Sequence, residues 1–193
     1  MTNTFAPQNG IKWNVDRLNE AFASGTYTVS GTGVSVVEKA KGFVELTFPI
    51  SALSVTMTDA TTAGSHGRQK ILTFPQGLIL VAGAVTDLTI ARVGTNITTT
   101  ASVVAALGTT GTATADATLT TTEANIIAST AATLTAGAGV FKGVSADTVT
   151  LNGTTTPAEV FLNFAIPDAG SAGNDALLVN GNIKLTFMLV GDN

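Results

Sequence analysis

Hydrophobic and polar side chains alternate along several segments of the chain. Residues 43–48 place three apolar side chains on one face, and residues 51–58 repeat this arrangement. Alternation with a period of two is typical of a β-strand that is buried on one face only. Pro49 lies between the two segments, and we expect the first strand to end there.

Similar runs recur along most of the chain and are separated by Gly, Asn, Asp and Pro. They lie at residues 27–30, 34–37, 69–74, 78–82, 87–93, 103–107, 113–119, 133–135, 140–142, 148–151, 159–166 and 176–190, the last interrupted at Asn180-Gly181. The pattern of residues 120–132 leaves their type open. Many short strands with frequent turn residues predict an all-β fold, an antiparallel β-sandwich that is jelly-roll-like.

Only residues 13–22 have the spacing of a helix, because Trp13, Leu18 and Phe22 fall roughly on one face. We therefore expect a short N-terminal arm and helix over residues 1–25. Residues 26–193 are expected to form a single β-sandwich domain.

The composition excludes several classes of function. Charged residues make up 11% of the chain, against about 25% in an average soluble domain. Cys is absent and there is one His, which excludes disulfides, Cys-ligated metals and a cysteine nucleophile. The formal net charge of −4 offers little to a phosphate backbone. We expect a protein that is not an enzyme and that binds no nucleic acid.

The mean hydropathy of +0.39 raises the question of a membrane segment. The longest apolar run, residues 77–85, is far shorter than the roughly 20 residues of a spanning helix. The first residues have neither a basic start nor an apolar run of the kind found in signal peptides. We expect no membrane partner.

One stretch is unusually poor in charge. Between Arg92 and Lys142 there is no basic residue, and the acidic residues are Asp116 and Glu123. Thr, Ala and Gly dominate there, which favours an ordered β segment over disorder, since disordered segments usually carry high charge. We expect this segment to contact like segments of neighbouring subunits.

The most polar stretch is residues 64–70, which hold His66 together with Arg68 and Lys70. A catalytic role would need a carboxylate and a hydroxyl brought in by the fold, so contact of Arg68 or Lys70 with a carboxylate of a neighbour is the better hypothesis. No phosphate-loop motif occurs, and the acids around residues 167–174 are too sparse for calcium. The sequence therefore offers no catalytic, cofactor-binding or metal-ligating residues.

Several strings resemble virion proteins of tailed bacteriophages, over roughly residues 42 to 193. They lie at residues 64–71, 74–77, 79–84, 122–127, 129–134, 136–139, 163–170 and 189–192. The resemblance is to capsid decoration, or cement, proteins, which are commonly trimeric with a β-sandwich or jelly-roll fold. It carries no catalytic motif.

The resemblance implies a virion structural protein that binds across capsomer junctions and stabilises the shell. Its partners would be the major capsid protein and itself, as a homotrimer on the capsid surface assembled in the bacterial cytoplasm. The candidates for the capsid interface are Thr2, Asn3, Phe5, Arg68 and Lys70. The alternatives are a tail or fibre-associated virion protein, or a secreted carbohydrate-binding or adhesin module.

Overall fold

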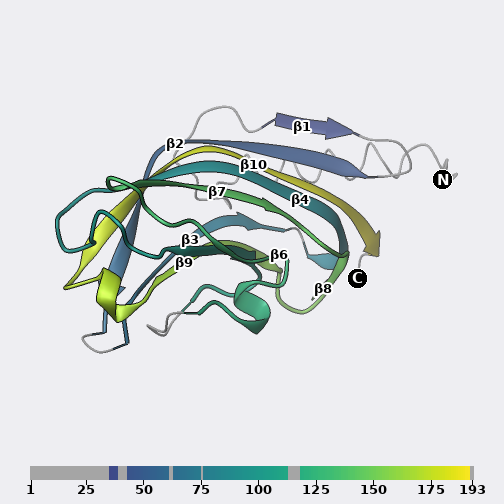
Figure 1. Ribbon diagram of the computed structural model, residues 1–193. Coiled ribbons are helices and arrows are strands. Elements are labelled where there is room, and N and C mark those ends of the chain that lie inside the picture. The colour runs from purple at the N-terminus through teal and green to yellow at the C-terminus, as the bar shows by residue number, and fades with distance from the viewer. Residues whose placement is uncertain (1–34, 39–42, 61–62, 75, 113–117, 192–193) are drawn as a thin grey trace, which may run out of the picture.

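A computed structural model describes residues 35–38, 43–60, 63–74, 76–112 and 118–191. Within these ranges the chain consists of ten strands joined by loops and two short 3₁₀ turns, η2 (Thr121–Glu123) and η3 (Asp168–Gly170) (Figure 1). All strand pairs are antiparallel. The expected arm and helix over residues 1–25, with Thr2, Asn3 and Phe5, lie outside the described residues.

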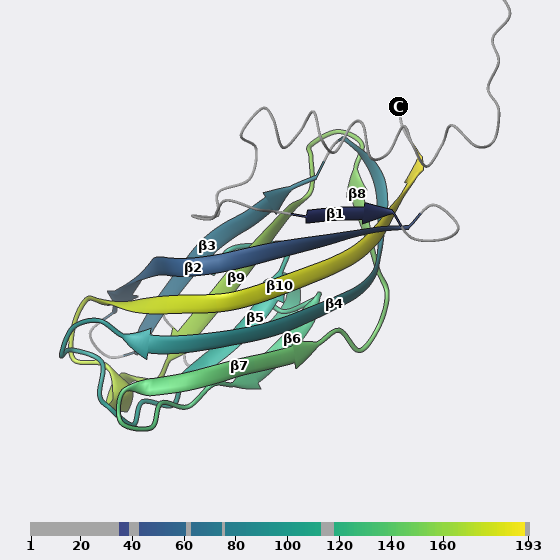
Figure 2. The same cartoon turned by 90° about the horizontal axis from the view of Figure 1, so that it is seen from above.

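The strands form two sheets that face each other. The first sheet has the order β2-β10-β4-β7, with β1 added beside β2 and β8 beside β4, and the second has the order β3-β9-β5-β6 (Figure 2). The bounds in the first sheet are β1 Ser35–Glu38, β2 Val44–Asp59, β4 Gly77–Arg92, β7 Ala138–Val144, β8 Val149–Gly153 and β10 Asp175–Gly191. Those in the second are β3 Ser65–Thr73, β5 Val104–Gly108, β6 Ile127–Ala131 and β9 Glu159–Ile166.

Two sheets of four strands in these orders have the connectivity of a jelly roll. The sheets are joined where β2 and β3 pair at Thr58–His66 and Asp59–Ser65. The expected all-β antiparallel sandwich of jelly-roll type is therefore confirmed.

The core lies between the inner faces of the two sheets. Its largest fully buried side chains include five phenylalanines, and the rings of Phe74 and Phe187 meet edge to face with centroids 4.9 Å apart. Alternate residues of β2 and β10 point into this core, as the sequence pattern predicts.

The prediction that Pro49 ends a strand is wrong. β2 continues through Pro49 for 16 residues, and Pro49 lies opposite Asn182 of β10. The described pairing of β1 with β2 reaches only to Thr47, so the missing N–H of Pro49 interrupts no bond between these two strands.

A β-bulge separates the two halves of β2. Ala52 has a φ of 51°, and the pairing with β10 shifts between Val179 and Gly181. The Ala52 N–H, displaced from the ladder, donates to Oδ1 of Asn180 at 2.7 Å. The bulge resets the alternation, so that Leu53 returns to the core three positions after Ile50.

Two other expectations about β-structure are corrected. Asn180-Gly181 does not interrupt the last strand, because β10 runs unbroken from Asp175 to Gly191 with Gly181 at a φ of 131°. Residues 133–135 do not form a strand, and Thr135 makes only an isolated bridge to Ala138. Residues 120–132, left open by the pattern, contain η2 and β6.

The outer face of the second sheet is covered by the chain itself. Ala106 of β5 and Ala165 of β9 point away from the main core, yet both are fully buried against Leu119. Part of the charge-poor stretch is therefore packed inside this domain, where short apolar side chains are needed. Its low charge there has an explanation that requires no neighbouring subunit.

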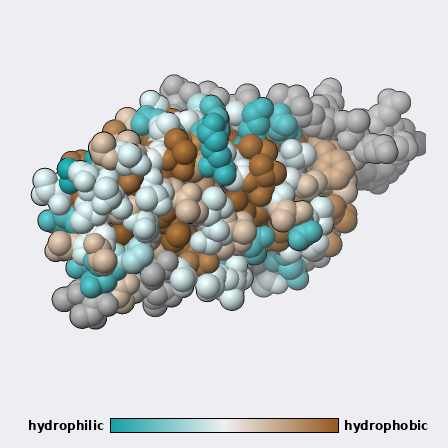
Figure 3. All heavy atoms as spheres, viewed as in Figure 1, coloured by the Kyte–Doolittle hydropathy of each residue, from teal (hydrophilic) through white to brown (hydrophobic). Residues whose placement is uncertain are grey.

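Strands β6 and β7 lie at the open edge of the sandwich. A side chain at Gly143 of β7 would collide with Ile127 of β6, and one at Gly139 would lie 2.7 Å from the Ala132 carbonyl oxygen. The space-filling view from this side shows apolar patches interrupted by polar residues (Figure 3). This close approach nearly closes the sandwich along one side.

Asp175 fixes the loops at one end of the sandwich. Its carboxylate accepts backbone N–H groups from Gly94 at 2.7 Å, Ile97 at 3.0 Å and Ala176 at 2.8 Å. Burial alone would raise the pKa of Asp175, but hydrogen bonds from these backbone groups outweigh it and hold the pKa below its ordinary value. The charged form thus stabilises the folded state.

We expect Asp175→Asn to lower the free energy of unfolding by about 2 kcal/mol at pH 7, because two or three charge-assisted bonds are weakened. The loss should be complete above the unfolded-state pKa of about 3.9 and should disappear as the pH falls through the lowered pKa of folded Asp175. Denaturant unfolding at pH 7 and at acid pH measures both. Asp87→Asn is the control, since Asp87 is exposed, and an equal effect of the two substitutions would contradict this account.

Candidate functional site

The outer face of the first sheet carries three exposed valines on neighbouring strands. Val85 of β4 lies directly opposite Val144 of β7, and Val140 is on the same face of β7. Their exposed fractions are 44%, 69% and 52% respectively. We call these three residues the valine face.

A single ion pair interrupts the valine face. Lys142 lies between Val140 and Val144 on β7, and its Nζ is 3.4 Å from Oδ1 of Asp87 on β4. Both side chains are about two-thirds exposed, so the pair contributes little to stability. The pair is neutral as a whole but places two charged groups among the three valines, and the exposed Lys184 of β10 lies opposite Val85 on the same face.

The two basic residues singled out by the sequence both lie on β3 but differ in surroundings. Lys70 forms an ion pair with Glu159 of β9, with Nζ and Oε1 3.0 Å apart. Its charge is therefore compensated within the domain. A carboxylate of a neighbouring molecule would therefore compete with Glu159 for Lys70.

Arg68 binds neutral groups instead. Its Nη1 donates to the carbonyl oxygens of Gly111 at 3.2 Å and Thr112 at 3.0 Å. Among the described residues, no carboxylate forms an ion pair with Arg68. The guanidinium is thus held in place by neutral groups, and the part of the chain that the structure describes places no carboxylate in an ion pair with it.

The loop that Arg68 contacts is itself held by Asn163, a residue that the sequence analysis did not select. Asn163 lies opposite Arg68 on β9 and is fully buried. Its Oδ1 accepts the Thr112 N–H at 3.0 Å, and its Nδ2 donates to the carbonyls of Thr110 and Glu123 at 2.9 and 2.8 Å. In the sequence, Asn163 stands out only as a single amide residue within the apolar run of residues 159–166.

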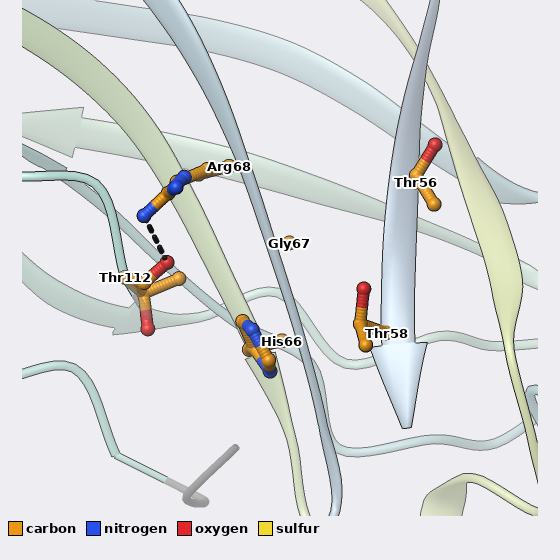
Figure 4. Close-up of a pocket in the computed structure, with 6 residues that line it drawn as sticks. All are labelled: Thr56, Thr58, His66, Gly67, Arg68 and Thr112. Carbon is orange, nitrogen blue, oxygen red and sulfur yellow. Dashed lines mark hydrogen bonds between the residues drawn. The ribbon is translucent and has the colours of Figure 1, made fainter. Parts of the chain in front are cut away.

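A cavity of about 220 Å³ opens beside Arg68, where β2 and β3 separate into different sheets. Figure 4 shows Arg68 and Thr112 on one side and two threonines of β2 on the other, with His66 between them. The lining residues are Thr56, Thr58, His66, Gly67, Arg68 and Thr112. The sequence analysis selected His66 and Arg68 in this set but not the three threonines.

Gly67 is required for the close approach of the two strands at this cavity. A Cβ atom on Gly67 would lie 2.7 Å from the carbonyl oxygen of Thr56 and would collide with the sulfur of Met57. A larger residue would therefore push β3 away from β2.

His66 is brought next to hydroxyl groups but not to carboxylates. The described residues of the cavity lining include three threonines and no acidic residue. The Nδ1 atom of His66 is buried without a hydrogen-bond partner. This arrangement lacks the carboxylate that a catalytic histidine needs for orientation and charge stabilisation.

The described residues contain no group of three or more His, Asp or Glu side chains placed to hold a metal ion. In the same part of the chain, no helix has the length and apolar character needed to cross a membrane.

No protein-family profile matches the sequence. No curated protein sequence matches it either.

Solved structures with some likeness belong to different functional groups. The N-terminal cellulose-binding domain of Cellulomonas fimi β-1,4-glucanase C has 12% identity and a TM-score of 0.35, with 82% of this chain and 84% of that domain covered. A chain of the cyanophage Pam1 capsid asymmetric unit has 16% identity and a TM-score of 0.28, with coverage of 84% and 96%.

A third structure is the infectious bursal disease virus VP2 subviral particle. Its chain has 10% identity and a TM-score of 0.35, and the match covers 82% of this chain but 36% of that one. The identities and TM-scores are low, so we draw nothing about function from these likenesses.

We expect Asn163→Leu to destabilise the domain by about 3 kcal/mol or more, because it leaves one buried N–H and two carbonyls without partners. Hydrogen exchange of the Thr112 amide should rise together with this loss. Denaturant unfolding and amide exchange measure the two effects. Asn182→Leu, at an exposed position of β10, is the control, and equal effects of both substitutions would refute the role given to Asn163.

Proposed function

We propose that this chain is a structural subunit of a tailed-bacteriophage virion, specifically a capsid decoration or cement protein. It would bind the major capsid protein across capsomer junctions and stabilise the assembled shell. The proposal rests on the sequence resemblance, on the low charge of the chain and on the valine face. According to this proposal, the protein is located at the capsid surface of the virion.

The valine face is the observation that carries the proposal. Three valines with exposed fractions of 44–69% lie on paired strands of one sheet, beside a neutral ion pair. Complete burial of such side chains is favourable by roughly 1.5–3 kcal/mol each relative to full exposure. Exposed apolar side chains on paired strands are suited to contact with another protein, and such a contact would also remove water from the Lys142–Asp87 pair.

The energetics of a cement protein fit contacts of modest size. A protein that binds the assembled shell but not the separate subunits stabilises the shell by mass action. When several copies are linked in one oligomer, each weak contact is strengthened by the effective concentration of the others.

The carbohydrate-binding alternative finds no support among the described residues. A glycan-binding face usually presents exposed aromatic rings for stacking, whereas the phenylalanines of the described part are buried or half-buried. Trp13 and Tyr27 lie outside that part. A tail or fibre-associated position on the virion remains the alternative location, and the capsid-binding experiment below decides between them.

We also propose that the chain has no catalytic activity. The cavity beside His66 contains no carboxylate, and the buried Nδ1 of His66 has no partner to orient the ring.

The double substitution Val140→Thr and Val144→Thr should weaken binding to shells of the same virus assembled without this protein by at least about tenfold. Threonine keeps the shape and β-branching of valine but replaces a methyl group with a hydroxyl that must lose water on binding. Co-sedimentation of the full chain with such shells measures binding. Val93→Thr, at a valine 60% exposed outside the valine face, is the control.

Wild-type protein that fails to bind those shells would refute the capsid role, and binding to isolated tails would place it there instead. Equal losses for the double variant and the control would remove the valine face from the interface.

The homotrimer makes a separate prediction. Light scattering after size exclusion of the full chain at micromolar concentration should give a mass of about three times 19.4 kDa. A mass of one chain over the whole concentration range would contradict the trimer.

A further inference from the structure

The cavity between β2 and β3 has the composition of an anion site, and we propose that it binds a carboxylate group. It presents the guanidinium of Arg68, the imidazole of His66 and the hydroxyls of Thr56 and Thr58, and the described residues that line it include no acidic side chain. This inference is independent of the role in the virion, because it rests on the geometry of one cavity.

Arg68 is ordered before any ligand arrives. Both of its hydrogen bonds to the 111–112 loop use Nη1, and the opposite edge of the guanidinium, formed by Nε and Nη2, can bind a carboxylate through two parallel bonds. The stem of the side chain lies so close to Gly111 that a Cβ there would collide with Cδ of Arg68. Part of the rotamer entropy that a free arginine would lose on binding is thus already lost in the fold.

The loop that holds Arg68 is in turn fixed to the sheet. Thr112 donates its N–H to the fully buried Asn163, which also binds the carbonyl of Thr110. The positive group is therefore mounted on a rigid support, and this rigidity is the usual requirement for a binding site of defined geometry.

His66 can add a second donor. Its Nδ1 is sealed from solvent and has no hydrogen-bond partner. An N–H at Nδ1 would be buried without an acceptor, which is unfavourable, so a proton on Nε2 is preferred. The ring can meet a ligand only through the edge that is not sealed, and that edge carries the Nε2–H donor.

A carboxylate fits this set better than a phosphate or a cation. One guanidinium matches one negative charge, whereas phosphate sites usually gather several cations or a series of backbone N–H groups. A volume of about 220 Å³ accommodates a carboxylate with the first carbons that carry it, given about 30 Å³ for a water molecule. The carboxylate can belong to a free small acid or to an acidic side chain of another protein.

The test is a titration of the ¹⁵N-labelled full chain followed by NMR at constant ionic strength. Acetate probes the free acid, and a blocked Gly-Glu-Gly peptide probes a protein side chain, with Gly-Gln-Gly as its neutral match. Saturable shifts at the Arg68 Nε–H and at the amides of Gly67 and Thr112 are expected. Tighter binding of the peptide assigns the site to a protein side chain, and tighter binding of acetate assigns it to a free acid.

Arg68→Met should weaken the binding at least about tenfold, while Lys70→Met should leave it unchanged. Both substitutions remove one positive charge from β3, but Lys70 is paired with Glu159 and does not line the cavity. Thr58→Val removes one hydroxyl without disturbing the loop and should weaken binding severalfold, which keeps the test decisive if Arg68→Met does not fold. Absence of saturable shifts, or equal weakening by the Arg68 and Lys70 variants, would overturn the proposal.

Discussion

The burial of one face of three long neighbouring strands is the constraint on which the rest of the structure depends. β2, β10 and β4 contain 16, 17 and 16 residues, whereas an average strand has about five or six. Strands of this length twist progressively, and the same face stays on the core because bulges reset the alternation. The bulge at Ala52 does so in β2, and a register shift opposite Thr186 and Phe187 does so in β4. Gly181 of β10 lies between Ile50 of β2 and Leu88 of β4. A Cβ atom on Gly181 would lie 3.0 Å from the Cα of Leu88.

Most strands could be predicted from the sequence because alternation is a local property. The long strands were divided in the prediction because a bulge and a turn leave the same local mark, namely a break in the alternation. Ile50 and Leu53 are both buried although three positions apart, and only the pairing with β10, more than a hundred residues away, identifies the break as a bulge. Pro49 strengthened the wrong interpretation, since a proline inside a paired strand is uncommon.

The candidate site could be predicted only in part, and the reason is again long-range. Arg68 and Lys70 are two positions apart and look equivalent in the sequence. The register with β9 places Glu159 within reach of Lys70, and the 111–112 loop within reach of Arg68. Thr56 and Thr58 of the cavity come from β2, which meets β3 over only two residue pairs before the strands separate. No local pattern contains these contacts.

The low charge of the chain has two different causes in the folded domain. On the second sheet, Ala106 and Ala165 are short and uncharged because Leu119 packs against them on that outer face. On the first sheet, Val85, Val140 and Val144 are exposed along β4 and β7, so burial within the domain does not explain them. The two faces of the sandwich are therefore not equivalent. The first sheet leaves apolar side chains exposed on its outer face, whereas the second sheet has part of its outer face covered by the chain itself.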